Sequence, residues 1–493
     1  MTNDETRTTN EGPAADGGKA RPGRESKPSA GAHDASPNPR RQALEVISRA
    51  LSPTGKAFAQ EILDERLTRA ALKPEDRRLA TELVFGVIRR LGTLDAVLAA
   101  YSERPLDELD PAVRQVLRIG LYQMLFLERI PAHAAVDESV RLARATGKTK
   151  ATGFVNAVLR SIGRDLQFAP QPDAARPRHC LAVGPGRACI LAKPVLPPPA
   201  DAAAWFGAAY SFPKLLVARW LGRYGATRAR ELCEAANETP VIFARPNSIK
   251  TSSADLVEKL RAEGVEAVPS PSGRTLRLPS GVQIARLKCF TDGLFQVQDD
   301  SSAAVAEFVD PQPGEMVLDL CAAPGGKTCH MAERMQRQGQ IVAVDDSQRR
   351  LERVVENMKR LDLPIIATVE AEGALFAHQN RNRFHRVLLD APCSNTGVLR
   401  RRVEARWRFT SQSLIEIVKQ QRELLDAALV ALKSGGSLVY STCSLEPEEN
   451  GEVVRAALRG KAGLRLDAEQ QLLPRRDGGD GIYMARIVRS APA

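Results

Sequence analysis

Hydrophobic positions divide the chain into a polar start and a long segment of helical periodicity. Residues 1–37 contain no Ile, Leu, Val, Phe, Tyr or Trp, so they cannot bury enough apolar surface to offset the entropy of ordering. We predict a disordered tail for this segment. From residue 38 to residue 165, hydrophobic residues recur at steps of three and four, as in Leu44, Ile47 and Leu51. This spacing predicts an all-α domain over 38–165.

Prolines interrupt the helical pattern between residues 166 and 200. The eight prolines there exclude a continuous helix, and we predict a linker or insertion over 166–200. The segment also contains His179, Cys180 and Cys189, whose spacing matches no established zinc pattern. We therefore assign no metal site.

Strand-like and helical patterns alternate in the rest of the chain. Residues 201–300 combine helical stretches with short apolar runs, which predicts a small α+β module. Between 301 and 490, helical segments separate five short apolar runs: Met316–Leu320, Ile341–Val344, Ile365–Val369, Arg386–Leu389 and Ser437–Ser441. This alternation predicts βαβ units, and hence an α/β domain with a parallel, doubly wound sheet that binds its ligand at the C-terminal ends of the strands.

Composition narrows the class of protein. No apolar stretch reaches the roughly 18 residues of a membrane-spanning helix and the start lacks a signal peptide, so we expect a cytoplasmic protein without a membrane partner. Eight cysteines without a C-x-x-C pair indicate free thiols in a reducing compartment. Lys and Arg number 70 against 59 Asp and Glu, a net charge of +11, which favours a polyanionic partner. A basic enzyme surface without such a partner is the alternative.

Two strand ends carry residues suited to an adenosine-type cofactor. The first strand runs into a loop whose small residues let backbone N–H groups approach a ligand: Cys321, Ala322, Ala323, Pro324, Gly325, Gly326 and Lys327. Asp345, at the end of the second strand, can accept hydrogen bonds from ribose hydroxyls. For the loop alone, a tight strand-to-helix turn without a ligand is the alternative.

The fourth and fifth strands each end near a cysteine. Asp390-Ala391-Pro392-Cys393 follows the fourth strand, and Ser441-Thr442-Cys443 follows the fifth. Because the C-terminal ends of parallel strands meet at one edge of a sheet, we expect the two thiols to converge on one cleft. For either cysteine alone, burial as a small hydrophobic residue is the alternative.

Three segments resemble the signature motifs of S-adenosylmethionine-dependent RNA cytosine-C5 methyltransferases. They are DLCAAPGGKT (319–328), DAPCSNTGVLRR (390–401) and YSTCSLEPEEN (440–450), in the order of the family. With VQD at 297–299 and Asp480-Gly481, the resemblance spans roughly residues 205–490. The preceding helical segment, notably 76–90 and 156–160, resembles a NusB-like RNA-binding domain. This pairing is similar to bacterial 16S ribosomal RNA cytosine-C5 methyltransferases of the RsmB type, also called Sun or Fmu.

The resemblance implies a covalent mechanism. The TC-motif cysteine, Cys443 here, is expected to add to C6 of cytosine, which makes C5 nucleophilic toward the methyl group of the cofactor. The PC-motif cysteine, Cys393, is expected to assist loss of the C5 proton and release of the enzyme. Asp390 is expected to hydrogen-bond the cytosine ring and to border the cofactor. A positive charge, from the cofactor or Lys327, would favour the thiolate of Cys443.

The resemblance also assigns the contacts to S-adenosylmethionine. It places the 321–327 loop around the methionine part, Asp345 on the ribose and Glu372 near the adenine, where the family more often has Asp. The family commonly has Gly at the position of Asn395. We expect that change to alter the turn beside Cys393 and to leave the reactive groups in place.

An arginine-rich run surrounds the Cys393 loop and supports RNA as the partner. Between 381 and 408 the chain has two acidic residues and eight arginines, Arg381, Arg383, Arg386, Arg400, Arg401, Arg402, Arg406 and Arg408. We interpret the run as a funnel for phosphates. Trp407 and Phe409 could stack on a base, but we expect at least one of them to pack in the core. A solvated charged face is the alternative.

The function predicted from the sequence is methylation of a cytosine in 16S ribosomal RNA, before or during small-subunit assembly, by a monomeric enzyme. The same chemistry on transfer RNA or another RNA is one alternative. A non-catalytic RNA-binding assembly factor is another, and the presence of both Cys393 and Cys443 argues against it. DNA is not expected as a substrate, because DNA cytosine methyltransferases use the PC-motif cysteine and need no second one.

Overall fold

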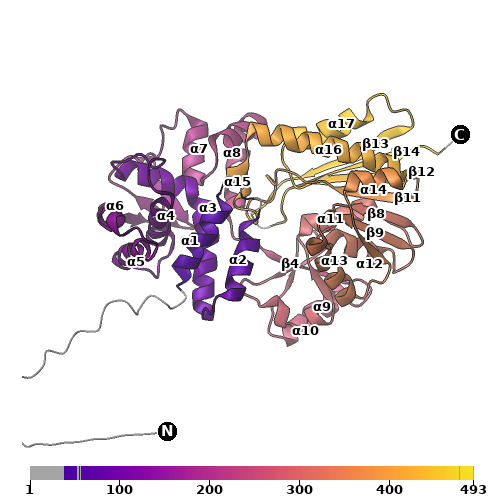
Figure 1. Cartoon of the computed structure of the whole chain (residues 1–493), viewed down its shortest axis with the longest axis horizontal. Coiled ribbons are helices and arrows are strands. Elements are labelled where there is room, and N and C mark those ends of the chain that lie inside the picture. Colours follow the sequence, from indigo (N-terminus) through magenta and orange to yellow (C-terminus); the bar gives the residue numbers. More distant parts are fainter. Residues whose placement is uncertain (1–37, 53–54, 56, 477, 492–493) are drawn as a thin grey trace, which may run out of the picture. The chain divides into compact units, whose positions relative to one another are not determined.

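The computed structural model describes residues 38–52, 55, 57–476 and 478–491 (Figure 1). The predicted disordered tail, residues 1–37, lies outside the described residues. Within the described ranges, no helix combines the length and the apolar character needed to cross a bilayer.

Residues 38–165 form an all-helical domain, as the hydrophobic spacing predicts. Its elements are α1 (Pro39–Ala50), α2 (Ala59–Arg69), α3 (Pro74–Tyr101), α4 (Pro111–Phe126), α5 (Ala132–Ala145), the short 3-10 helix Thr149–Ala151 and α6 (Thr152–Asp165). The side chains of Asn38 and Asp110 cap the N-termini of α1 and α4. Helices α3 and α4 approach closely at Gly86, where a Cβ atom would lie 2.1 Å from the Tyr122 ring.

The proline-rich segment contains a small antiparallel sheet that the sequence did not predict. Its strands are β1 (Gln167–Ala169), β2 (Cys180–Gly184) and β3 (Arg187–Ile190), in the order β1-β3-β2. Cys180 and Cys189 are buried as small hydrophobic side chains. Strands this short, broken by prolines, give little periodic signal.

Two helices and a second small sheet connect this segment to the C-terminal domain. Helices α7 (Ala202–Tyr210) and α8 (Lys214–Asn237) come first, and α8 is kinked at Gly225, where φ is +73°. The α+β module contains β4 (Ile242–Pro246), α9 (Ser253–Ala262), β5 (Val268–Pro269), β6 (Leu276–Leu278), the 3-10 helix Ile284–Arg286, α10 (Lys288–Thr291) and β7 (Phe295–Val297). Its four strands pair antiparallel in the order β5-β6-β4-β7.

The C-terminal domain is built on a seven-stranded sheet with the order β10-β9-β8-β11-β12-β14-β13. Its elements are α11 (Asp300–Val309), β8 (Met316–Leu320), α12 (Gly326–Arg334), β9 (Gln340–Asp345), α13 (Gln348–Leu361), β10 (Ile366–Glu370), α14 (Gly373–Gln379), β11 (Phe384–Asp390), α15 (Ala405–Arg408), α16 (Ser411–Ala431), β12 (Leu432–Thr442), the 3-10 helix Pro447–Glu449, α17 (Gly451–Leu458), β13 (Leu464–Leu472) and β14 (Ile482–Arg489). Alternate strand residues face opposite layers: Leu318 packs with α14, α16 and α17, and Val317 packs with α11, α12 and α13. Figure 1 shows these two sets of helices on opposite faces of the sheet. The doubly wound prediction is thus confirmed.

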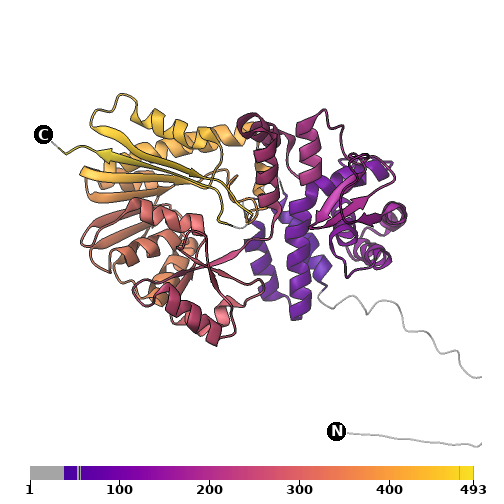
Figure 2. The same ribbon diagram turned by 180° about the vertical axis from the view of Figure 1, so that it is seen from behind.

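The prediction of an entirely parallel sheet is wrong. Strands β8 to β12 are parallel, but β14 pairs antiparallel with both β12 and β13, and Figure 2 shows these last strands in yellow at one side of the sheet. Strand β13 lies at the edge of the sheet, and Arg465, Asp467 and Glu469 give it the polar character of a protected edge. It therefore lacks the apolar run that marked the other strands.

The predicted phosphate funnel is also wrong, because most of the arginine-rich run is used inside the protein. Arg400 forms a buried ion pair with Asp480, and Arg401 pairs with both Asp480 and Asp299. Arg408 donates to carbonyl oxygens of the helical domain at Ala50 and Ala57. The run therefore joins the Cys393 loop to the neighbouring parts of the protein.

The aromatic residues of the run lie in the same internal contact. The Trp407 indole N–H donates to Ile88 O at 2.8 Å, and the Phe409 ring is buried. Core packing of at least one of the two rings is thus confirmed for Phe409, while Trp407 is part-buried and bonded to α3.

Arg406 illustrates what these arginines contribute. Its fully buried guanidinium donates only to neutral oxygens, namely Asn237 Oδ1 at 2.9 Å, Ser211 O and Ala236 O at 3.1 Å, Leu399 O at 3.2 Å and Arg89 O at 3.3 Å. Burial holds the pKa of Arg406 well below its ordinary value. The side chain thus bonds α3, α7 and α8 to the loop after Cys393.

We expect Arg406→Leu to lower the free energy of unfolding by about 3–5 kcal/mol, because several buried acceptors lose their donor at once. Thermal unfolding followed by circular dichroism measures the change. The control is Arg383→Ala, which removes an exposed arginine and should cost less than about 0.5 kcal/mol. Equal unfolding temperatures for the two variants would contradict a structural role for Arg406.

Candidate active site

The loop from Cys321 to Lys327 connects β8 to the N-terminus of α12. Gly325 has φ +91°, and a Cβ atom there would lie 3.1 Å from the Val354 side chain, so the turn requires glycine. A Cβ on Gly326 would meet nothing closer than the Gln298 side chain at 3.7 Å. The loop is therefore closely packed at Gly325, whereas a Cβ at Gly326 would make only an ordinary contact with Gln298.

Asp345 lies at the end of β9, directly beside this loop. Its buried carboxylate accepts hydrogen bonds from Ala323 N and Ser347 N, both at 3.2 Å, and forms an ion pair with Arg350 at 3.3 Å. Burial raises the pKa of Asp345, and the charge of Arg350 opposes that effect. Glu372 is exposed and directly precedes α14. Its neighbour Ala371 donates its N–H to Asp345 O, so Glu372 lies close to the end of β9. The loop, Asp345 and Glu372 therefore follow three adjacent strands at one edge of the sheet.

Asp319 is a site residue that the sequence reasoning missed. One carboxylate oxygen accepts a hydrogen bond from Thr328 Oγ1 at 2.6 Å, and the other is buried with no partner among the described residues. Burial raises the pKa of Asp319 to about 7, and the charge of Asp390 adds to the effect. The available signal was an acidic residue within the otherwise apolar run Met316–Leu320.

Lys327 and Asp390 form an ion pair between α12 and the end of β11. Ser441 Oγ also donates to Asp390, at 2.7 Å. Burial by itself would lower the pKa of Lys327, but the charge of Asp390 and its hydrogen bond, together with the charges of Cys443 and Asp319, outweigh burial and raise the pKa. The pair keeps a positive charge near Cys443.

The two cysteines of the predicted cleft lie together. Strands β11 and β12 are parallel neighbours that pair Asp390 with Ser441, so the residues that follow them meet above the sheet. The Sγ atoms of Cys393 and Cys443 are 3.0 Å apart. The pKa of Cys393 is raised well above its ordinary value, first by the contact with Cys443 and then by burial. The geometry therefore allows both thiols to contact the same substrate group.

Sequence comparisons match all three parts of the chain. Residues 306–488 match the family described as 16S rRNA methyltransferase RsmB/F, residues 37–164 match the NusB family, and residues 212–285 match the ferredoxin-like domain of RsmF/B-like methyltransferases. Two similar relatives are the ribosomal RNA small subunit methyltransferase B of Proteus mirabilis and the probable enzyme of the same name from Synechocystis. Each is 34% identical over 88% of this chain; the first match covers 97% of its relative and the second 96%.

The chain belongs to the ribosomal RNA small subunit methyltransferase B family. It is an RNA methyltransferase, and its methyl donor is S-adenosylmethionine. A crystal structure of a methyltransferase homolog from Pyrococcus horikoshii is 30% identical and superimposes with a TM-score of 0.53, covering 60% of this chain and all of that one.

Asn395, where this chain departs from the family pattern stated above, has φ +62°. Glycine and asparagine are the residues that adopt this left-handed conformation most readily, which explains why asparagine fits. Its amide donates to Cys393 O at 2.8 Å and accepts from the Cys443 thiol at 3.3 Å. The turn is thus retained, and the reactive groups of the methyltransferase stay together.

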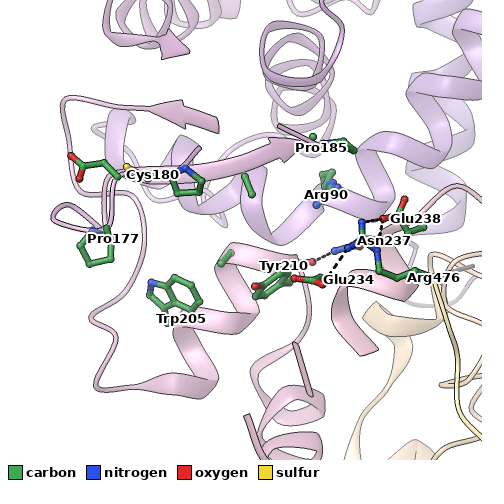
Figure 3. Close-up of a pocket in the computed structure, with 16 residues that line it drawn as sticks. Arg90, Pro177, Cys180, Pro185, Trp205, Tyr210, Glu234, Asn237, Glu238 and Arg476 are labelled. Carbon is green, nitrogen blue, oxygen red and sulfur yellow. Dashed lines mark hydrogen bonds and ion pairs between the residues drawn. The ribbon is translucent and has the colours of Figure 1, made fainter. Parts of the chain in front are cut away.

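A cavity of about 550 Å³ lies away from this site, between the β1-β3-β2 sheet and helices α7 and α8 (Figure 3). Trp205 and Tyr210 line it, and its Arg476 forms ion pairs with Glu238 at 2.7 Å and Glu234 at 3.7 Å. It contains none of the residues predicted to bind the cofactor or react. Across the described part of the chain, no group of His, Cys, Asp and Glu is arranged to hold a metal ion.

Proposed function

We propose that this methyltransferase modifies C5 of a cytosine in small-subunit ribosomal RNA, through a covalent adduct between Cys443 and C6 of the base. The observation that carries the proposal is the pair of thiols 3.0 Å apart at neighbouring strand ends, beside the Lys327–Asp390 pair. The names of its relatives specify ribosomal RNA as their substrate. We assign RNA recognition to 38–165 and 201–300, and chemistry to 301–490.

The chemistry requires two thiols with different tasks. The Cys443 thiolate forms a bond to C6, which directs electron density to C5. S-adenosylmethionine supplies the methyl group, and its sulfur keeps the electron pair of the broken S–CH₃ bond. Cys393 then takes part in removing the C5 proton, so that the C5–C6 double bond re-forms and the Cys443 thiolate leaves. The balance is a methylated cytosine, S-adenosylhomocysteine and one proton.

The residues of the strand ends fit a cationic cofactor. One Asp319 oxygen, which has no partner among the described residues, is a buried acceptor just before the cofactor loop. Asp345 would accept from the ribose hydroxyls, and Glu372 would lie near the adenine. The 321–327 loop would hold the methionine part.

We expect the affinity for S-adenosylmethionine to rise with pH through about 7. Asp319 has a pKa of about 7 in the free protein, because it is buried, and a bound cation favours its carboxylate form. Binding near pH 6.5 should therefore release a proton, and the affinity should fall toward lower pH by up to about tenfold per unit. Isothermal titration calorimetry in buffers of different ionisation enthalpy measures both effects. A dissociation constant that does not change across this range, or the same pH dependence in Asp319→Asn, would contradict the expectation.

The function is tested by methyl transfer from labelled S-adenosylmethionine to unmodified 16S ribosomal RNA, transfer RNA and DNA in parallel, with nucleoside analysis of the products. We expect label in 5-methylcytidine from ribosomal RNA alone. Label in transfer RNA would show that transfer RNA is a substrate and would contradict the assignment to ribosomal RNA alone. Label at another atom of cytosine would refute the covalent mechanism. No label in free RNA or in partly assembled small subunits would favour a non-catalytic assembly factor.

A further inference from the structure

The Glu449 side chain connects the loop that contains Cys393 to the loop that contains Cys443. This residue ends the 3-10 helix Pro447–Glu449, six residues after Cys443, and its side chain is fully buried. One oxygen accepts from Ser394 N at 2.8 Å, and the other accepts from the Ser394 and Ser444 hydroxyls, the latter at 2.5 Å. Ser394 and Ser444 directly follow the two cysteines, so one carboxylate fixes both loops.

A second contact strengthens the same link. Gln421 Nε2, from α16, donates to Glu449 at 3.0 Å and to Pro392 O, just before Cys393, at 2.9 Å. The Ser394 and Ser444 hydroxyl oxygens are 3.2 Å apart. The residues on both sides of Cys393 are therefore held by the Glu449 carboxylate or by its amide partner.

The charge of Glu449 is not neutralised by a cation. Among the ion pairs of the described residues, none joins Glu449 to Lys or Arg, and the carboxylate is held by one N–H, two hydroxyls and one amide instead. Hydrogen bonds to a carboxylate favour its charged form. A buried negative charge therefore lies next to the Cys393–Ser394 peptide bond.

We propose that Glu449 is a positioning residue of the methyl-transfer site, which holds the two cysteine loops at reacting distance and disfavours the thiolate of Cys393. The inference rests on the proposed function for the roles of the two thiols. Two thiolates 3.0 Å apart would repel strongly, so the pair carries at most one negative charge at ordinary pH. A carboxylate beside Cys393 disfavours the thiolate there.

The other charged and titratable groups around the pair act in the same direction. Cys393 faces Cys443, Glu449 and Tyr440, and Glu449 is among the groups that raise the pKa of Cys393, after the contact with Cys443, burial and the Cys443 charge. The Lys327 ammonium interacts with Cys443. The anionic groups thus act on Cys393, and the cation acts on Cys443.

The test measures which thiol reacts in the full chain without RNA. Iodoacetamide attacks thiolates, and mass spectrometry gives the initial rate of alkylation of each cysteine from about pH 6 to about pH 10, which spans the ordinary thiol range. We expect Cys443 to react first in the unaltered protein. In Glu449→Gln the pH at which alkylation of Cys393 reaches half of its maximal rate should fall by about one pH unit. We expect kcat to fall about tenfold and the affinity for S-adenosylmethionine to stay unchanged.

Two further variants make the test decisive. Glu448→Gln removes a neighbouring, part-exposed carboxylate that pairs with Arg219 and should leave both alkylation profiles unchanged. Glu449→Asp keeps the charge and should preserve the order of reaction. Equal Cys393 profiles in Glu449→Gln and Glu448→Gln would overturn the proposal. If Glu449→Gln does not fold, reaction of Cys393 before Cys443 in the unaltered protein or in Glu449→Asp overturns it.

The alkylation result is independent of the RNA substrate. Absence of methyl transfer to any nucleic acid would refute the proposed function and would leave the alkylation order unchanged. Reaction of Cys393 before Cys443 in the unaltered protein, together with normal methyl transfer, would instead refute only the role of Glu449.

Discussion

Replacement of Cys443 by alanine is expected to abolish methyl transfer, with kcat lowered by at least about 10³-fold, because the proposed C6 adduct forms on this thiol. Cys393 is not expected to substitute for it, since burial and the charge of Glu449 still raise the pKa of Cys393 when the contact with Cys443 is gone. Methyl transfer under single-turnover conditions with small-subunit ribosomal RNA measures the loss. The fold should be retained, because both thiols are only part-buried.

The Cys393→Ala variant is expected to fail at a later step. Without the second thiol, the Cys443–C6 bond forms but the C5 proton is lost slowly, so a covalent RNA–protein adduct should accumulate. A denaturing gel with labelled RNA detects the adduct as a band of low mobility. The control is Cys233→Ala, a buried cysteine of α8 outside the site, which should form no lasting adduct. Normal turnover of Cys443→Ala together with an inactive, adduct-free Cys393→Ala would show that the roles are wrongly assigned.

The parts of the fold that the sequence predicted are those with a strong periodic signal. The helical domain has hydrophobic residues at every third or fourth position, and the inner strands of the large sheet are apolar runs. Strand β13 is polar because it lies at the sheet edge. Strand β14 is an apolar and mostly buried run, so its hydrophobic pattern was present in the sequence but was not interpreted as a strand. The local hydrophobic pattern indicates which residues are buried, and so it does not predict a half-exposed strand such as β13.

The convergence of Cys393 and Cys443 was predictable for a similar reason. Parallel neighbours align their C-terminal ends, so residues that follow two adjacent strands meet wherever the strands lie in the sequence. The arginine-rich run was misread because charge in a sequence does not reveal its partners. Arg400 and Arg406 find carboxylate and carbonyl acceptors that are 80 or more positions away, at Asp480 and at Ser211.

The same limitation explains why Asp319 and Glu449 were not predicted as site residues. Asp319 is informative because one of its oxygens has no partner in the described part of the chain, and Glu449 because it accepts from two separate loops. Neither property is contained in the local sequence. Both depend on which buried groups the fold brings next to a carboxylate, and that becomes visible only when the tertiary contacts are known.

Asp390→Asn is the other change with a large expected effect, a fall in kcat of about 10²–10⁴-fold. Asp390 bonds to Lys327 and Ser441, so its loss removes both the proposed contact to the base and the counter-ion of a buried ammonium. Burial then acts on Lys327 without the opposing charge of Asp390, and the pKa of Lys327 should fall. The positive charge near Cys443 is consequently lost at lower pH than in the unaltered protein.

The pH dependence distinguishes this explanation from a general loss of structure. Residual activity of Asp390→Asn should decline on the alkaline side at a lower pH than that of the unaltered enzyme, in single-turnover rates measured from about pH 7 to about pH 10. Asp426→Asn is the matched control, because it breaks an exposed Lys–Asp pair with Lys461 and should change neither kcat nor the profile. An unshifted alkaline limb in Asp390→Asn would mean that the Lys327 charge does not support the Cys443 thiolate, and the pair would then act only in positioning the substrate.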